Sequence, residues 1–439
     1  MKVLKFGGTS VGSAQRMKEV AKLITDGEQK IVVLSAMSGT TNTLVEISDY
    51  LYKKNPEGAN EIINRLEAKY KQHVNELYST DEYKQKTQEF IKAQFDYIRS
   101  YTKDIFTLFE EKVILAQGEL ISTNMVTNYL QEQGVNAILL PALEFMRTDK
   151  NSEPDPVYIK EKLAAQLEIH PDAEIYITQG FICRNAYGEI DNLQRGGSDY
   201  TASLIGAAVN ASEIQIWTDI DGMHDNDPRI VDKTSPVRHL HFEEAAELAY
   251  FGAKILHPTC VQPAKYANIP VRLLNTMEST APGTLISNDT EKGKIKAVAA
   301  KDNITAIKIK SSRMLLAHGF LRKVFEIFES YQTSIDMICT SEVGVSVSID
   351  NTKHLNEILD DLKKYGTVTV DQDMCIICVV GDLEWENVGF EAKALDAMRD
   401  IPVRMISFGG SNYNISFLIR EEDKKKALQS LSDHLFNNK

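Results

Sequence analysis

The chain begins with a short apolar strand that runs directly into a glycine pair, in the order Met1-Lys-Val-Leu-Lys-Phe-Gly-Gly-Thr-Ser10. Two adjacent glycines let the backbone approach a ligand closely and turn its N–H groups toward an anion. Lys5, near the end of the strand, can add a mobile positive charge over the same anion. This combination predicts a polyphosphate site. The P-loop motif, a dinucleotide-binding glycine motif that opens a helix, and the protein-kinase signatures are all absent from the sequence.

Composition and charge narrow the class of protein. The 439 residues suffice for about three domains of ~150 residues each. A net charge of −13 argues against nucleic acid and against an anionic membrane as partners. No apolar run approaches the ~18 residues of a membrane span, and glycines interrupt the first apolar stretch too early for a signal peptide. We therefore expect a cytoplasmic protein.

The five cysteines are few and odd in number, which suits a reducing compartment. Cys375 and Cys378 have the spacing of a metal or redox pair, but they stand in the apolar run Met-Cys-Ile-Ile-Cys-Val-Val, which predicts a buried strand. Positions i and i+3 of a strand face opposite sides, and no second pair completes a zinc site. We interpret both as structural cysteines.

The first two thirds of the chain alternate between strand-like and helix-like patterns. Short apolar runs at 31–34, 174–178 and 214–218 are separated by helical stretches, which predicts an α/β domain with a mainly parallel sheet. Polar, glycine-rich clusters follow these runs, where ligands of such sheets gather. Residues of about 57–112 predict a largely helical insertion, either a scaffold or a mobile lid over the site.

The last third of the chain contains an internal repeat. Residues of about 280–300 include the Pro, Gly, Asn and Asp residues that are typical of loops, which indicates a domain boundary. Beyond it, Met337 matches Met405 and Val347 matches Ile415, each 68 positions apart, with an amphipathic helix before and after each pair of strands. The equal offsets and the same element order favour two duplicated β-α-β-β-α-β units over a chance similarity.

A second glycine cluster, Gln194–Ala202, precedes a compact apolar helix. Ser198 or Asp199 is expected to cap that helix, whose N-terminus can hold an anion. Arg195 suits a carboxylate and Asp199 an ammonium group, so the cluster fits an α-amino acid. The alternative is a plain helix cap with a surface arginine.

Two further segments carry weaker signals. Glu119 follows Gln117-Gly118 and heads a helical run, where a glutamate usually just complements the helix dipole. The segment 38–42 reads as a generic strand-to-helix turn that could bind an anion.

An acidic segment, Thr218–Arg229, raises the suspicion of an EF-hand, but its glycine and its twelfth residue do not fit. A nucleotide-binding loop fits better, with Arg229 for phosphate. Lys254 is either a third cation at this site or a solvated helix lysine. Phosphoryl transfer needs charge neutralisation and alignment above all, and a Mg²⁺ ion held mainly by ATP is expected.

Several of these segments resemble the signature of the aspartate kinases, within the amino acid kinase superfamily. The matching motifs span nearly the whole chain: Lys5–Val11, Val33–Asn42, Gly118–Glu119, Thr178–Phe181, Arg195–Asp199, Trp217–Asp219, Asp227–Arg229 and Phe251–Lys254. The resemblance implies an α/β amino acid kinase fold, a mainly parallel sheet sandwiched by helices, over residues 1–290. It implies that residues 298–439 form tandem ACT domains, about 312–372 and 373–439. One ACT unit is typically inserted into the other, so a strand within 300–311, such as Thr305–Lys310, is expected to complete the last segment.

The resemblance also implies an activity, namely ATP-dependent phosphorylation of the side-chain carboxylate of L-aspartate to 4-phospho-L-aspartate, the entry step towards lysine, threonine and methionine. Lys5 and Asp199 would be catalytic. Aspartate would be bound by Thr41, Glu119, Phe181, Arg195, Gly196, Gly197 and Ser198. ATP would be bound by Lys5, Phe6, Gly7, Gly8, Thr218, Asp219, His224, Arg229, Lys254 and Ile255. At His224 related sequences often carry a tyrosine near the adenine.

The regulatory part most resembles the lysine-inhibited, single-function type. Because the sequence stops at Lys439, we expect no homoserine dehydrogenase domain of the kind that bifunctional relatives carry. The implied effector residues are Met314, His318, Gly319, Phe320, Leu321, Ser334, Ile335, Asp336, Thr340, Ser341 and Glu342. A buried Asp336 and Glu342 could pair with the ammonium group of lysine. ACT units usually pair across subunits, which implies a homodimer or homotetramer.

Two rival functions stay open. One is a different enzyme of the same fold that acts on glutamate, acetylglutamate or a nucleotide, although such enzymes usually lack this ACT tail. The other is a catalytically dead amino-acid sensor, against which the intact Lys5, Glu119, Arg195 and Asp199 argue.

Overall fold

The computed structural model describes residues 1–103, 105–193, 196–252, 256–311 and 318–436. The chain divides into two compact units, 1–223 with 255–288, and 224–254 with 289–439. This division differs from the expected one at 290, because segment 224–254 is tied to the C-terminal part. The Val298 amide donates to the Asp225 carbonyl at 2.8 Å, and Asn226 Nδ2 donates to the Leu428 carbonyl at 2.9 Å.

The first unit is built on a sheet with the strand order β3-β4-β2-β1-β7-β9-β10. Neighbouring strands are parallel from β3 to β9, as predicted, and β10 pairs with β9 in the antiparallel sense. The strands are β1 (Lys2–Phe6), β2 (Lys30–Leu34), β3 (Ala137–Leu140), β4 (Ile175–Gln179), β7 (Ile214–Thr218), β9 (Val271–Asn275) and β10 (Thr284–Ser287). Strand β2 is buried throughout, which explains its uninterrupted apolar run.

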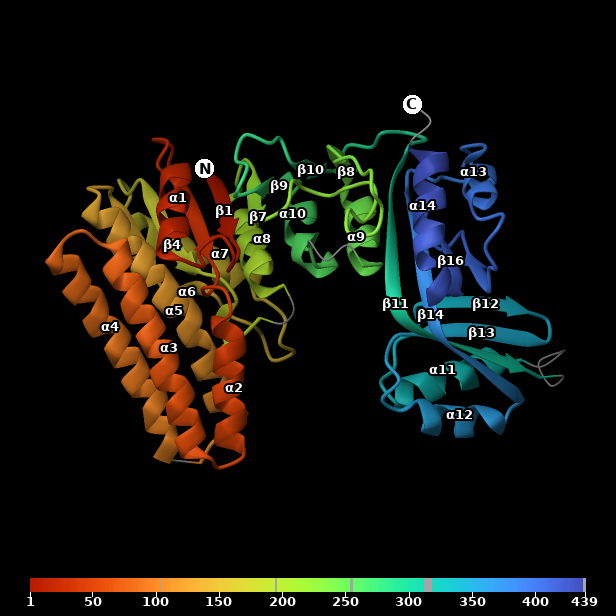
Figure 1. The fold of residues 1–439 in the computed structure, drawn as a ribbon, viewed down its shortest axis with the longest axis horizontal. Helices are drawn as coiled ribbons and strands as arrows, with labels where there is room; N and C mark the ends of the chain where they lie inside the picture. The colour runs from red at the N-terminus through yellow and green to blue at the C-terminus, as the bar shows by residue number, and fades with distance from the viewer. Residues whose placement is uncertain (104, 194–195, 253–255, 312–317, 437–439) are drawn as a thin grey trace. The chain divides into compact units, whose positions relative to one another are not determined.

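Helices and one hairpin complete this unit (Figure 1). The hairpin is formed by β5 (Ile182–Arg184) and β6 (Ile190–Asn192). The helices that accompany the sheet are α1 (Ala14–Ile24), α6 (Ala142–Phe145), α7 (Pro156–Ile169), α8 (Gly197–Val209) and α10 (Gln262–Tyr266), with the 3-10 turn η2 (Pro258–Val261).

The expected helical insertion is confirmed as a helical bundle. The expected range of about 57–112 covers α3 (Pro56–Leu77), α4 (Asp81–Ser100), η1 (Tyr101–Lys103) and the start of α5 (Leu108–Glu132). Helix α2 (Thr40–Tyr52) precedes this range and joins the same bundle. Apolar residues of all four helices join the core of the sheet. Helix α5 starts at a capping box, in which Thr107 and Glu110 satisfy each other's backbone amides, and it continues past the expected end of the insertion. A lid movement of this bundle stays a prediction.

The second unit contains a six-stranded antiparallel sheet in the order β12-β13-β11-β14-β16-β15. Its elements are β8 (His239–His241), α9 (Phe242–Tyr250), β11 (Ile295–Lys310), α11 (Phe320–Ser330), β12 (Met337–Ser341), β13 (Gly344–Ile349), α12 (Leu355–Lys363), β14 (Thr367–Gly381), α13 (Phe390–Ala397), β15 (Met405–Ser407), β16 (Asn414–Arg420), η4 (Glu421–Asp423) and α14 (Lys424–Leu435). The repeated helices and strand pairs of the two predicted units are all present, each unit with its own apolar core.

The two halves of this sheet share two long strands. Residues 305–310 of β11 pair with β13 and with 367–371, within the first half. Residues 295–301 of β11 pair with the later part of β14 and complete the second half. The expectation that Thr305–Lys310 completes the last segment was therefore wrong: an earlier stretch of the same strand does so, across register shifts between Lys301 and Ala306.

Cys375 and Cys378 lie fully buried in β14, in agreement with the predicted buried strand. Among the described residues, no three His, Cys, Asp or Glu side chains come together as a metal site. In the same part of the chain, no helix is both long enough and apolar enough to cross a membrane.

Candidate active site

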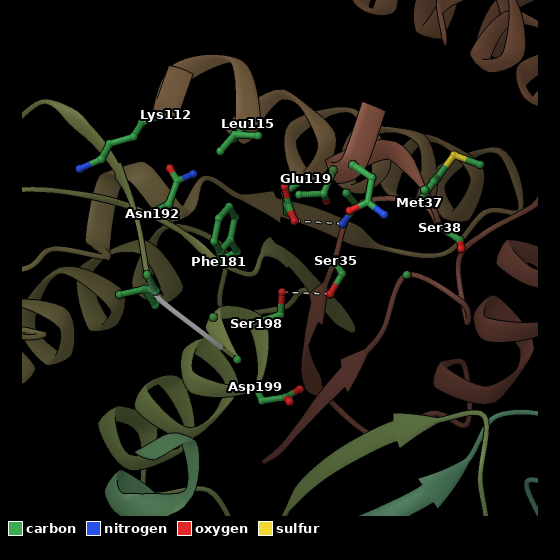
Figure 2. A pocket seen from close by; sticks show the side chains of 18 of the residues that line it. Ser35, Met37, Ser38, Lys112, Leu115, Glu119, Phe181, Asn192, Ser198 and Asp199 are labelled. Carbon is green, nitrogen blue, oxygen red and sulfur yellow. Dashed lines mark hydrogen bonds between the residues drawn. The ribbon is translucent and has the colours of Figure 1, made fainter. Parts of the chain in front are cut away.

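A cavity of about 690 Å³ opens in the first unit where β1 and β2 end and α5 and α8 face each other (Figure 2). Nine of the predicted site residues line it: Lys5, Gly8, Thr41, Glu119, Phe181, Gly196, Gly197, Ser198 and Asp199. The other residues that line it are Ser35, Ala36, Met37, Ser38, Gly39, Asn42, Leu108, Glu111, Lys112, Leu115, Asn192 and Leu193. The parallel topology thus brings together segments that lie far apart in the sequence.

Lys5 and Asp199 form an ion pair at the base of this cavity. Lys5 Nζ lies 2.6 Å from Asp199 Oδ1, and the two side chains are only 11% and 13% exposed. Lys5 comes from β1 and Asp199 from the first turn of α8. A cation held in this way at the end of a strand can neutralise an anion that enters the cavity.

Helix α8 begins differently from the expectation. Its cap is Gly196, with φ of 73°, and no side chain caps the helix, so the prediction that Ser198 or Asp199 does so was wrong. The reason is that both side chains have other partners. Ser35 Oγ donates to Ser198 Oγ at 2.9 Å, and Asp199 pairs with Lys5. Both side chains remain on the cavity wall.

Of the glycine pair that follows β1, Gly8 packs tightly against the segment that follows β2. A Cβ atom on Gly8 would lie 2.8 Å from the Ala36 carbonyl oxygen, and one on Gly7 would lie 3.6 Å from Lys5 Nζ. The close approach explains why a glycine is needed at position 8. Phe6 is fully buried and stacks on Trp217, so its side chain belongs to the core.

Glu119 lies in the middle of α5, and its interpretation as a first-turn glutamate was wrong. The helix begins eleven residues earlier, at Leu108, because the insertion runs into it without a break. Glu119 accepts a hydrogen bond from the Ala36 amide at 3.2 Å, and its Oε2 has no hydrogen-bond partner among the described residues. Burial raises the pKa of Glu119 to about 8, against the lowering effect of the Ala36 amide. A buried carboxyl with a free oxygen is suited to receive an ammonium group.

The dipeptide Ser35-Ala36 holds several parts of the site together. Ala36 donates to Glu119, the Ser35 hydroxyl donates to Ser198, and the Ser35 carbonyl accepts from the Ser122 hydroxyl at 2.8 Å. Neither residue was among the predicted site residues. Its position directly after a buried parallel strand was the signal that could have identified it.

Other residues of the cavity were missed for a different reason. Lys112 pairs with Asp191 at 2.7 Å, and Leu108, Glu111 and Leu115 lie on the same helix. Leu108, Glu111 and Lys112 stand inside the insertion predicted for about 57–112, and Leu115 lies just beyond it. Nothing local in the sequence indicates that α5 turns one face to the cavity.

Phe181 has a backbone φ of 69°, which is rare for a bulky residue. Its amide donates to Thr201 Oγ1 at 3.1 Å, which holds this conformation against α8. A Cβ atom on Gly197 would lie 3.2 Å from the Phe181 Cα, so the first turn of α8 packs directly on this residue. Strained residues of this kind gather at functional sites.

The predicted nucleotide residues fall into both units. Thr218 ends β7 and Asp219 follows it, exposed, in the first unit. His224 and Arg229 belong to the second unit, where His224 contacts Thr234 Oγ1 at 2.9 Å and Arg229 makes a two-pronged contact with Asp227. Arg195, Lys254 and Ile255 lie outside the described residues.

The predicted effector residues come from two segments of the second unit, and Met314 lies outside the described residues. His318, Gly319, Phe320 and Leu321 stand at the start of α11, and Phe320 belongs to the core. Ser334, Ile335 and Asp336 precede β12, which leads on to Thr340, Ser341 and Glu342. Asp336 has a buried carboxylate, as expected. Glu342 does not, because it lies exposed in the turn between β12 and β13.

Residues 1–275 match the family model of the amino acid kinase family, and residues 377–435 match that of the ACT domain. Together with the cavity at the strand ends and the paired halves of the second unit, these matches define the class: an amino acid kinase with a C-terminal ACT region.

Similar proteins narrow this class. Aspartokinase 1, chloroplastic, of Arabidopsis thaliana is 35% identical and covers 99% of this chain and 80% of its own. Lysine-sensitive aspartokinase 3 of Escherichia coli (strain K12) is 32% identical and covers 99% of both chains. Two solved structures of E. coli aspartokinase III are 32% identical to this chain, and each match covers 99% of it. The matches cover 99% and 100% of the two E. coli chains, respectively. The complex with lysine and aspartate has a TM-score of 0.82, and the complex with aspartate and ADP one of 0.84. The chain belongs to the aspartokinase family.

Proposed function

We propose that the chain transfers the γ-phosphoryl group of ATP to the side-chain carboxylate of L-aspartate. A carboxylate oxygen of aspartate forms a bond to the γ-phosphorus, the bond to the bridging oxygen of ADP breaks, and the products are 4-phospho-L-aspartate and ADP. The observation that carries the proposal is the Lys5–Asp199 ion pair at 2.6 Å in a cavity that also contains Glu119. This arrangement supplies the neutralising charge and the alignment on which phosphoryl transfer depends.

The cavity residues support a specific role for each end of aspartate. Glu119 has a free buried oxygen for the α-ammonium group, and Arg195 is assigned to a carboxylate. Thr41, Phe181, Gly196, Gly197 and Ser198 complete this substrate set, and every member except Arg195, which lies outside the described residues, lines one cavity. Lys5 balances the charge on the transferring group, and Asp199 fixes the position of the Lys5 ammonium.

For the nucleotide we propose the set Lys5, Phe6, Gly7, Gly8, Thr218, Asp219, His224, Arg229, Lys254 and Ile255. The tight backbone turn at Gly8 supports a phosphate cradle, and Phe6 can contribute only its backbone. A Mg²⁺ ion would supply further charge neutralisation when bound. Since no group of three candidate ligands occurs among the described residues, its ligands would come mainly from ATP and water.

We propose that residues 1–290 are catalytic and that residues 298–439 bind L-lysine as a feedback inhibitor. The buried carboxylate of Asp336 supports an ammonium site. Asp336 and Glu342 are six positions apart, about 20 Å along an extended strand, which exceeds the length of one lysine molecule. This span and the outer position of β12 in its sheet support an assembly of two or four copies.

The turnover of a single variant, Lys5→Ala, distinguishes an active enzyme from a catalytically dead amino-acid sensor. Lys5→Ala should lower aspartate-dependent ADP formation by at least about 100-fold, because it removes a charge that acts on the transferring group. Lys2→Ala is the matched control, since Lys2 lies on the same strand and its side chain, 39% exposed, pairs with Glu28 and not with Asp199. Equal turnover in both variants would contradict the assignment of Lys5, and no turnover in the wild type would favour the sensor.

A further inference from the structure

A polar cluster in the second unit joins three segments of the chain. Lys301 Nζ lies 2.7 Å from Asp336 Oδ1 and 2.9 Å from Asp350 Oδ2. It also lies 4.4 Å from the centre of the Tyr250 ring, and the Tyr250 hydroxyl donates to Asp336 Oδ1 at 3.0 Å. The Asp336 side chain is 1% exposed, and its Oδ2 has no hydrogen-bond partner among the described residues.

The position of Lys301 follows from the irregularity of β11. The pairing of this strand with β14 shifts register between Lys301 and Ile304, and Asn303 takes a left-handed conformation with φ of 59°. Lys301 is thus the last paired residue of the 295–301 stretch, at the point where the two ACT halves join. Asp336 and Asp350 belong to the first half, and Tyr250 is the last residue of α9.

In this cluster, a lysine side chain of the chain itself occupies the position proposed for the ammonium group of the effector. Asp336 is the predicted partner for the ammonium group of free lysine, and Lys301 presents the same chemical group to the same oxygen. Lys301 and Tyr250 both contact Asp336 Oδ1, so an effector ammonium that pairs with this oxygen must take the place of Lys301. Burial raises the pKa of Asp336, and a buried carboxylate of this kind is costly without a cation.

We propose that Lys301 is an internal competitor for the ammonium group of the effector at Asp336. The inference rests on the proposed inhibition by L-lysine. Effector binding then exchanges one ammonium for another, so the ion pair between Lys301 and Asp336 must break before Asp336 can hold the effector. Because Tyr250 bonds to the same carboxylate oxygen, the exchange also disturbs the last residue of α9. This helix directly precedes Phe251 and Gly252, at the start of the segment assigned to ATP.

The test compares inhibition by L-lysine in wild type, Lys301→Met and Lys308→Met. Lys308 is the matched control because it lies exposed on the same strand. In Lys301→Met we expect the half-inhibitory concentration of L-lysine to fall at least tenfold, with turnover in the absence of lysine within twofold of wild type. Lys308→Met should leave both values unchanged. Titration calorimetry with L-lysine should show the same tenfold gain in affinity.

Two further variants distinguish failure of the competitor role of Lys301 from failure of the proposed inhibition by lysine. Asp336→Asn should abolish the response to lysine. If wild type responds and Asp336→Asn does not, but a folded Lys301→Met keeps the wild-type half-inhibitory concentration or raises it, the competitor role is overturned while the effector site stands. If wild type shows no inhibition by lysine, the proposed regulation itself fails. Should Lys301→Met lose its native circular dichroism, Lys301→Gln takes its place, with the same tenfold decrease expected.

Discussion

Glu119 carries an unusual protonation equilibrium for a carboxyl group. Burial raises its pKa to about 8 in the free site, so it is largely protonated at neutral pH. If the carboxylate form receives the ammonium group of aspartate, kcat/KM for aspartate should rise with pH and level off above about pH 8. Glu119→Gln should lose this rise and lower kcat/KM by about 10- to 100-fold. A pH profile of initial rates at low aspartate measures both effects.

Although Glu119→Gln should lower kcat/KM, it should raise the stability of the folded protein at high pH. The ordinary pKa of 4.5 applies to the unfolded chain and about 8 to the folded one, so the folded state binds more protons between these values. The contribution of Glu119 to the stability of the wild type therefore falls as the pH rises from 4.5 to 8. Glu119→Gln escapes this loss and should have the higher melting temperature at pH 8.5, with Glu89→Gln, exposed on α4, as control. A lower melting temperature at pH 8.5 would contradict the raised pKa.

The residues of the site differ in how far local sequence could reveal them. Lys5 and Gly8 were predictable because a strand followed by glycines is a local pattern with a direct chemical meaning. The role of Glu119 depends on burial by Ala36 and on a helix that starts at Leu108, neither of which is visible near position 119. Ser198 was assigned as a cap because its long-range partner, Ser35, could not be known.

At the scale of elements, Gly118 sets how closely α5 approaches the turn between β2 and α2. A Cβ atom at this position would lie 2.7 Å from the Ala36 Cβ and 3.3 Å from the Thr40 Cγ2. Gly118→Ala should therefore push α5 outward, weaken the bond between Ala36 and Glu119, and reduce the free energy of unfolding by about 1–3 kcal/mol. The KM for aspartate should rise as well.

The control for this substitution is Gly410→Ala, since a Cβ atom there meets no atom within 4 Å. Denaturant unfolding and aspartate saturation curves of the two variants give the comparison. An unchanged KM in Gly118→Ala would mean that the contact with Ala36 does not position Glu119.

The elements themselves were largely predictable, because the parallel strands are short apolar runs and the repeated helices are amphipathic. Strand β11 was not. Its residues 295–310 form one continuous strand that serves both ACT halves, and pairing with β13 and β14 decides where each half begins. The assignment of segment 224–254 likewise depends on distant contacts, such as Asn226 with Leu428.

At the scale of the whole molecule, the outer strand β12 is the surface on which the proposed assembly can be tested. Ile338 lies on this strand and is 37% exposed. Ile338→Glu should shift the molar mass in light scattering toward that of a single chain and weaken inhibition by lysine, because like charges would face each other across a two-fold interface. Val157→Glu, at an exposed position on α7, should leave the mass unchanged. An unchanged mass in Ile338→Glu would exclude β12 from the interface.

The central claim is that the cavity between α5 and α8 phosphorylates the side chain of aspartate. The most direct measurement is ATP-dependent formation of an acyl hydroxamate in the presence of hydroxylamine and Mg²⁺, with L-aspartate and L-glutamate in separate reactions. The account predicts hydroxamate from aspartate and none above background from glutamate. Product from glutamate alone, or from neither acid with folded protein, would contradict it.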